Sequence, residues 1–167
     1  MENKTCIDNL VHTSENIVYP LPLSTCNLSA IKTAYNLSNH NEVVTFLGEN
    51  LNEVSYWDIN HNSEDGSTIT VWQKGGELLK IDHHKIWYDE EMVSSFITKL
   101  GVPDKKLDYY RGVVTMKHKA WIYSDKGIAL FLGRSENNIY SISYFSITSL
   151  ENYENGLHPT QREREFE

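Results

Sequence analysis

Three histidines and two aspartates occur within a short stretch in the middle of the chain, and imidazole and carboxylate groups are common metal ligands. These residues are Asp58, His61, Asp82, His83 and His84. Neighbouring residues of a strand point to opposite faces of a sheet, so only one of His83 and His84 can face a shared ion. No spaced pair of cysteines or histidines accompanies them. We therefore interpret the histidines as surface or turn residues and predict no metal site.

Nucleophilic catalysis would need a thiol or hydroxyl held beside a base. Cys26 with His12, His40 or His61 supplies only compatible residue types, and no Gly-rich elbow surrounds a serine. The glycines at 75 and 76 indicate a hairpin turn, because no Lys-Ser or Lys-Thr follows them into a helix as in a phosphate-binding loop. We predict no catalytic residue and no cofactor.

Aromatic residues beside acids are the feature that points to binding. The chain has ten tyrosines and four tryptophans, and several adjoin carboxylates. Tyr and Trp can anchor a protein interface, and acids around them would steer a basic ligand. The same rings could instead form core between sheet and helices, and both roles stay open. The candidate partner-binding residues are Tyr56, Trp57, Asp58, Glu64, Asp65, Trp72, Asp82, Tyr88 and Asp89.

Charge narrows the class of partner. The net charge of −8 disfavours nonspecific binding to nucleic acid or acidic membranes and permits a basic partner. Residues 51–101 hold nine acidic and four basic residues, net −5, whereas residues 102–150 hold four acidic and seven basic, net +3. We interpret the basic residues of the second segment as a solvated face rather than phosphate contacts. The acids at 89–91 could touch a partner or cap a helix.

The elements that must position these groups show an apparent repeat. Apolar residues at helical spacing run from Val93 to Leu100, and Gly101 then ends the helix before a strand-like run. A similar order occurs 53 residues earlier, where residues 44–48 stand in place of 97–101. A fixed period favours duplication, and two unrelated helix-hairpin segments are the alternative.

This pattern predicts an α+β protein of two similar units, each a helical segment packed on an antiparallel meander. The predicted parts are an N-terminal arm (1–28), a first unit (29–88), a second unit (89–148) and a polar C-terminal tail (149–167). In the first unit we expect helices near 29–37 and 42–47 and strands at 54–59, 67–73, 77–81 and 85–88. In the second we expect a helix at 90–100 and strands at 107–116, 119–124, 128–132 and 139–147.

Two structural questions stay open. The glycines at 75 and 76 allow two alignments of the repeats, which differ by one residue and exchange the faces of a strand. One alignment exposes Trp72, Trp121 and Tyr123, and the other places Trp121 and Tyr123 in the core. A homodimer is also possible, because nothing obvious guards the edge of the predicted strand at 139–147.

The sequence predicts a cytoplasmic protein. No stretch approaches the roughly 18 apolar residues that span a bilayer. The first ten residues lack a basic region followed by an apolar segment, so no secretory signal is expected. Only Cys6 and Cys26 are present, and reduced thiols are expected in preference to a bridge between them.

A set of residues in the second unit has looser counterparts in the first. The two sets are Leu100, Gly101, Pro103, Asp104, Trp121, Tyr123, Gly127 and Ile139, and Leu47, Gly48, Trp57, Trp72, Gly75 and Ile86. With them, residues 29–148 resemble the tandem fold of the beta-lactamase inhibitory protein and the single-unit envelope lipoproteins of the SmpA/OmlA type. The chain departs from that pattern in lacking an export signal and the inhibitor's paired cysteines, and Pro103 has Leu51 or Asn52 near its place in the first unit. The resemblance implies a protein-binding surface.

Charge and resemblance together predict an immunity protein that neutralises a toxin, with a basic nuclease as the expected target. Acids of the first unit would replace nucleic-acid phosphates in the toxin cleft, and Trp57, Trp72 and Tyr88 would anchor the contact. Two alternatives stay open. One is an adaptor or envelope-assembly module, and the other is a small-ligand protein or enzyme with a pocket between helices and sheet.

Overall fold

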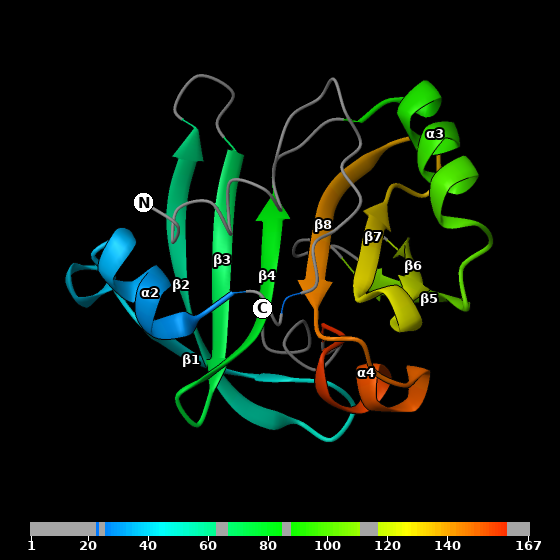
Figure 1. Ribbon diagram of the computed structural model, residues 1–167. Helices are drawn as coiled ribbons and strands as arrows, with labels where there is room; N and C mark the ends of the chain where they lie inside the picture. Colours follow the sequence, from blue (N-terminus) through cyan, green and yellow to red (C-terminus); the bar gives the residue numbers. More distant parts are fainter. Residues whose placement is uncertain (1–22, 24–25, 63–66, 85–87, 111–116, 160–167) are drawn as a thin grey trace.

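The computed structural model describes residues 23, 26–62, 67–84, 88–110 and 117–159, and within them eight strands form one antiparallel sheet (Figure 1). The strand order is β1-β2-β3-β4-β8-β7-β6-β5. The strands are β1 (Val43–Leu47), β2 (Asn52–Asn62), β3 (Ser67–Lys74), β4 (Glu77–His84), β5 (Lys105–Tyr110), β6 (Lys117–Tyr123), β7 (Ile128–Leu132) and β8 (Ile139–Phe145). The α-helices are α2 (Leu28–Ala34), α3 (Glu90–Leu100) and α4 (Leu150–Gly156).

The prediction of two helix-on-sheet units is wrong. Strand β4 pairs with β8 from Lys80↔Phe145 to His83↔Ile142, and this pairing fuses the two meanders into one continuous sheet. The pairing joins residues about 60 positions apart, a contact that local sequence patterns do not report. The sheet therefore continues across the predicted boundary between residues 88 and 89.

The segment predicted as a helix at 42–47 is strand β1. Its first three residues, Val43, Val44 and Thr45, are β-branched and favour extended backbone. A turn at Gly48 then returns the chain into β2. Gly48 has a φ of 75°, and a Cβ there would lie 1.9 Å from the backbone oxygen of Asn155 in α4. Only glycine fits this close approach, which explains the Leu-Gly pattern that resembled a helix end.

Helix α3 confirms the prediction of a helix at 90–100, and its ends follow from the sequence. Asp89 accepts a hydrogen bond from the backbone N–H of Met92 at 3.1 Å, and Gly101 ends the helix with a φ of 79°. Glu90 and Glu91 occupy the first turn, where negative charge favours the helix dipole. The acids at 89–91 thus have a structural role.

We expect Asp89→Ala to lower the free energy of unfolding by about 1 kcal/mol, because the cap acceptor is lost. Asp89→Asn keeps that acceptor and should cost much less. Urea denaturation of both variants measures the difference. Equal losses in the two variants would show that the carboxylate charge, rather than the cap hydrogen bond, is what stabilises the helix.

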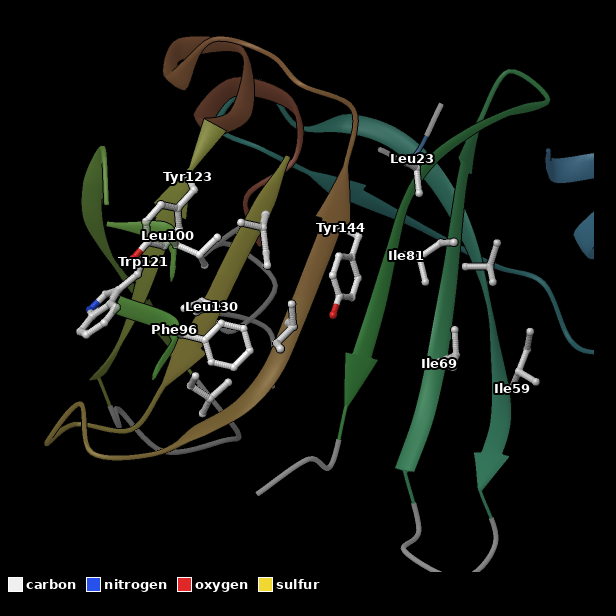
Figure 2. Packing of buried hydrophobic residues seen from close by; sticks show 14 of the residues in the cluster. Leu23, Ile59, Ile69, Ile81, Phe96, Leu100, Trp121, Tyr123, Leu130 and Tyr144 are labelled. Atoms are coloured by element: carbon white, nitrogen blue, oxygen red, sulfur yellow. The ribbon is translucent and has the colours of Figure 1, made fainter. Parts of the chain in front are cut away.

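Helices α2 and α3 cover one face of the sheet, which we call the α2/α3 face. Figure 2 shows Ile59 and Ile69 as neighbours on this face of β2 and β3, with Ile81 of β4 further along the same face. Trp121 and Tyr123 also belong to this core and are 4% and 0% exposed. The structure thus selects the alignment that buries Trp121 and Tyr123. Burial and the nearby Asp104 carboxylate raise the pKa of Tyr123 to about 12.

The opposite face, which we call the α4 face, has its own smaller core. Tyr153 of α4 and Leu157 after it pack on residues of β5 to β8, including Ile122, Phe131 and Phe145. No helix was predicted in residues 149–167. Ser149 caps α4 by accepting from the N–H of Asn152, so the polar composition of this segment conceals a helix with one buried side. Residues 160–167 lie outside the described ranges.

Strand β8 lies in the interior of the sheet between β4 and β7. The open edge that motivated a homodimer at residues 139–147 is therefore absent, and that reason for a dimer was wrong. The sheet edges are β1 and β5. None of the helices in the described ranges is long and apolar enough to cross a membrane.

Candidate functional site

A cavity of about 650 Å³ lies on the α4 face of the sheet. It spans strands from both sides of the β4–β8 junction, and its walls include Tyr56, Asp58, Trp72, His84, Tyr109 and Tyr140. Tyr56 and Asp58 alternate along β2 with Trp57 and Ile59, which are buried on the other face. The strand period of two therefore separates a polar cavity from an apolar core. Its volume is within the range of ligand sites.

Strand register places polar side chains side by side across four strands. Asp58 pairs with Thr70, Thr70 with Asp82, and Asp82 with Ser143. These positions would be apolar if the face were an ordinary core. A buried polar row is stable only when its members satisfy one another by hydrogen bonds.

The deepest part of this row is an ion pair. Lys80 Nζ lies 3.3 Å from Asp82 Oδ2, and the two side chains are 1% and 8% exposed. The same oxygen accepts a 2.8 Å hydrogen bond from Trp72 Nε1, and Ser143 donates to Oδ1. Lys80 also lies 4.8 Å from the centre of the Trp72 ring, at cation–π distance. Asp82 thus fixes the floor of the cavity.

A second chain of hydrogen bonds leads from Asp58 to His84. Thr70 Oγ1 donates to Asp58 Oδ1 at 2.7 Å and lies 2.9 Å from His84 Nε2. On the other side of the ring, Ser141 Oγ lies 2.6 Å from His84 Nδ1 and donates to the backbone oxygen of His83 at 3.1 Å. We assign each hydroxyl hydrogen to a carboxylate or carbonyl oxygen, which can only accept. With that assignment both His84 nitrogens donate, which is the pattern of an imidazolium.

We expect Thr70→Val to convert His84 to the neutral form at pH 7, because Nε2 loses its acceptor. Ring ¹⁵N chemical shifts would show two protonated nitrogens in the parent protein and one in the variant. Loss of a charged hydrogen-bonded network should also cost about 1.5–3 kcal/mol of stability. Thr68→Val, which changes a cavity residue outside this chain of bonds, is the control. A neutral His84 in the parent protein would contradict the assignment.

Aromatic rings line two parts of the cavity. The Tyr56 and Trp72 rings are 4.8 Å apart with an interplanar angle of 44°. At the other end of the cavity, the centre of the His118 ring lies 5.4 Å from that of Tyr109 and 5.7 Å from that of Tyr140. The Tyr140 hydroxyl also forms a 3.2 Å hydrogen bond with His118 Nδ1. These contacts hold the rings in place, so the cavity wall is pre-organised.

The segment after α4 contributes Pro159 to the wall of the cavity. His158, the residue before it, contacts two distant parts of the chain. Its backbone oxygen accepts from the Gly48 N–H at 2.9 Å, and the Nε2 of its ring donates to the backbone oxygen of Asp108 at 3.1 Å. The pKa of His158 is lowered to about 4. Burial is the main cause and Lys80 lowers it too, while the hydrogen bond to the Asp108 backbone and the Glu154 charge act in the opposite direction. One neutral histidine therefore connects the β1–β2 turn to edge strand β5.

Four of the nine residues predicted to bind a partner come together in this cavity: Tyr56, Asp58, Trp72 and Asp82. Trp57 instead belongs to the core on the α2/α3 face, and Lys32 Nζ lies 5.2 Å from the centre of its ring. The remaining described candidates are placed elsewhere: Tyr88 stacks on Phe96 at 5.9 Å, and Asp89 caps α3. Glu64 and Asp65 lie outside the described residues.

Sequence reasoning missed Thr70, His84, Tyr109, Tyr140 and Ser141. His84 was interpreted as a turn residue, although it ends β4. The signal that could have found it is the alternation Lys80, Asp82, His84, three polar groups on one face of one strand. The small-ligand alternative stays a prediction. The cavity on the α4 face lies opposite to α2 and α3, and a second cavity, of about 500 Å³, lies between α2 and β2 with Lys32 and Trp57 in its walls.

The structure differs from the expected thiol state. Cys26 is disulfide-bonded, and Cys6, the other cysteine of the chain, lies outside the described residues. His83 and His84 follow the strand alternation, with His83 5% exposed and His84 in the cavity wall. Among the described residues no group of three His, Cys, Asp or Glu side chains is arranged to hold a metal ion.

Comparison with known proteins leaves the chain without an assigned family. No family model matches the chain, and no curated protein matches it. A matching solved structure is a cysteine-rich secretory protein from Staphylococcus aureus, with a TM-score of 0.41 and 6% sequence identity. The match covers 72% of this chain and 43% of that protein, so this chain spans less than half of its length. A similarity this weak supports no argument about fold or function.

Proposed function

We propose that the protein is an immunity protein that binds and neutralises a basic protein toxin, and that the α4-face cavity is its contact surface. The observation that supports this proposal is the gathering of Tyr56, Asp58 and Trp72 at one opening. Half-buried aromatic rings beside a carboxylate are the composition of an interface hot spot for a basic partner.

A binding role fits the cavity better than a catalytic one. Asp82 accepts from Lys80, Trp72 and Ser143, so its lone pairs are committed to the floor of the cavity. The hydroxyl hydrogens of Thr70 and Ser141 are likewise used within the protein. Groups held this way present a rigid surface, and rigidity reduces the entropy lost on binding.

Occlusion would be the mechanism. The toxin would place a basic region of its active cleft against the cavity, and Asp58 would replace a phosphate of its substrate. The net charge of −8 would favour the encounter at low ionic strength and weaken it as salt screens the charges. We leave Trp57 and Tyr88 out of the anchor set, because the Trp57 ring is buried in the core and the half-buried Tyr88 ring stacks on Phe96 of α3, outside the cavity lining.

Co-expression with the product of the gene immediately upstream tests the proposal. We expect a protein that is toxic alone, forms a stoichiometric complex and is silenced in it. Tyr56→Ala and Asp58→Asn should each weaken the complex at least about tenfold, as expected for hot-spot residues. Glu91→Gln removes an exposed acid from the first turn of α3 and should leave the complex unchanged. An upstream product that neither binds nor harms cells would overturn the proposal.

The cellular compartment of the protein distinguishes this proposal from a second one, in which the protein is a binding module of the cell envelope. An immunity protein against a nuclease would act in the cytoplasm, as the sequence predicts. The disulfide at Cys26 instead favours an oxidising compartment, and so a protein-binding module of the cell envelope. Cell fractionation with trapping of free thiols distinguishes the two: reduced cysteines in the cytosolic fraction support the immunity protein, and oxidised cysteines in the envelope fraction support the module.

A further inference from the structure

We propose that the Asp58 end of the cavity is a receptor for one arginine side chain of the partner. The guanidinium would lie against the Tyr56–Trp72 ring pair and form its ion pair with Asp58. The inference rests on the proposed function only in that a protein carries this arginine.

The charge that would bind a cation belongs to Asp58. The other acid of the cavity, Asp82, is already paired with Lys80 at 3.3 Å. Asp58 is exposed, and Thr70 orients it through a 2.7 Å hydrogen bond to Oδ1. Among the described residues no donor contacts Oδ2, so this oxygen can accept from a ligand. One carboxylate oxygen is thus held by Thr70, and the other keeps its capacity to accept.

The ring pair selects a guanidinium over an ammonium ion. Tyr56 and Trp72 are neighbours across β2 and β3, with ring centres 4.8 Å apart. Tyr56 precedes Asp58 by two residues on β2, so ring and carboxylate share one face. Guanidinium is planar, stacks on aromatic rings and donates to carboxylates in a fixed geometry, whereas an ammonium ion is strongly hydrated and compact. This combination of groups therefore matches arginine.

His84 gives the site a pH signature. The ring that we assign as an imidazolium forms a hydrogen bond with Thr70, and Thr70 in turn donates a hydrogen bond to Asp58. Among the described residues, the charged or titratable groups that line the cavity with His84 are Asp58 on β2, Asp82 on β4, Tyr109 on β5 and Tyr140 on β8, and Lys80 on β4 is paired with Asp82. A guanidinium at Asp58 adds positive charge near the imidazolium and disfavours it. Arginine binding should therefore release a proton and tighten as the pH rises.

The test uses the full chain and two small probes, N-acetyl-arginine amide and its uncharged analogue N-acetyl-citrulline amide. Binding is followed by the shift of the Trp72 indole N–H resonance at pH 6 and pH 8. We expect a Kd on the order of millimolar for the arginine probe, with the citrulline probe at least about tenfold weaker. Asp58→Asn, which keeps the acceptor for Thr70, should lose the preference for arginine, and Glu91→Gln should retain it.

Equal affinity for the two probes would overturn the inference, because the site would then not recognise charge. Binding that does not change between pH 6 and pH 8 would overturn the placement beside His84. The outcome is separable from the proposed function. An upstream toxin that is silenced in a complex weakened by Tyr56→Ala, with no shift from the arginine probe, would overturn the arginine receptor alone. Arginine binding without a toxic partner would overturn the immunity proposal alone.

Discussion

Replacing Asp82 by alanine is expected to lower the free energy of unfolding by about 3–5 kcal/mol, because the substitution leaves the Lys80 charge buried without a partner. Lys80 is 1% exposed, and the ammonium lies 3.3 Å from the lost carboxylate. Trp72 Nε1 and Ser143 Oγ would lose their acceptors in the same change. Urea denaturation at neutral pH measures the loss, and the Trp72 indole resonance reports on the cavity floor.

The exposed pair of Lys119 and Asp108 is the control. Its atoms are closer, at 2.6 Å, but the two side chains are 39% and 30% exposed. Lys119→Met should therefore cost no more than about 1 kcal/mol, because water screens the pair. A loss as large as that of Asp82→Ala would show that distance, rather than burial, controls these energies.

A double-mutant cycle with Lys80→Met and Asp82→Ala separates the pair from the individual side chains. Removing both charges should cost clearly less than the sum of the single changes, because no uncompensated charge remains. Additive losses would contradict the ion pair as the cause. If the Asp82→Ala protein does not fold, Asp82→Asn keeps the size of the side chain and some hydrogen bonding and provides the second comparison.

Local signals in the sequence predicted several elements correctly. The acids, the apolar spacing and the glycine around Val93 and Leu100 predicted α3, and the spacing of Ile128, Leu130 and Leu132 predicted β7. Each of these signals lies within a dozen residues. They reflect capping and the side-chain period of a strand, which act on the chain locally. β7 itself is buried on both faces.

The assembly of the sheet could not be predicted in this way. The pairing of β4 with β8 depends on contacts such as Asp82 with Ser143, which are 61 residues apart. The apparent repeat misled because Leu47 and Gly48 end a strand, whereas Leu100 and Gly101 end a helix. The same two residue types thus accompany two different elements.

For the site, the sequence identified the residue types but only part of the geometry. Tyr56, Asp58, Trp72 and Asp82 share the cavity, whereas Trp57 follows the strand alternation to the other face. Tyr109 and Tyr140 reach the cavity only because the sheet is continuous across the β4–β8 junction. Once that pairing is known, alternation along each strand predicts the lining.

Acidification is expected to destabilise the protein through His158. The pKa of His158 is about 4 in the folded protein, below the ordinary value of 6.5, so folding favours the neutral ring. A group with a lowered pKa contributes its full stability above the unfolded value and loses it as the pH falls through about 6.5 to about 4. A difference of this size corresponds to about 3 kcal/mol. Urea denaturation at pH 7, 5.5 and 4 measures the loss.

His158→Gln isolates this contribution. Gln cannot take up a proton in this range, so the difference between the two proteins should shrink or reverse between pH 7 and pH 4, while the carboxylates contribute equally to both. The variant will also lose stability at pH 7, because it disturbs the bonds to Asp108 and Tyr153. Only the change with pH is diagnostic. The same pH dependence in both proteins would contradict the assignment, and so would an imidazole NMR titration of His158 near its ordinary value.

Protonation of His158 should loosen one particular part of the fold. Nδ1 is the acceptor for the Tyr153 hydroxyl, so the proton would force this hydroxyl to stop donating to the ring and would place a cation near buried Lys80. The backbone oxygen of the same residue accepts from the Gly48 N–H, and the next residue, Pro159, lines the cavity. Hydrogen exchange at the Gly48 and Glu49 amides should therefore accelerate at pH 5 beyond the intrinsic change, whereas the amides in the interior of β3 should not. Uniform acceleration would indicate global unfolding instead, because a local release affects only the strands that His158 connects.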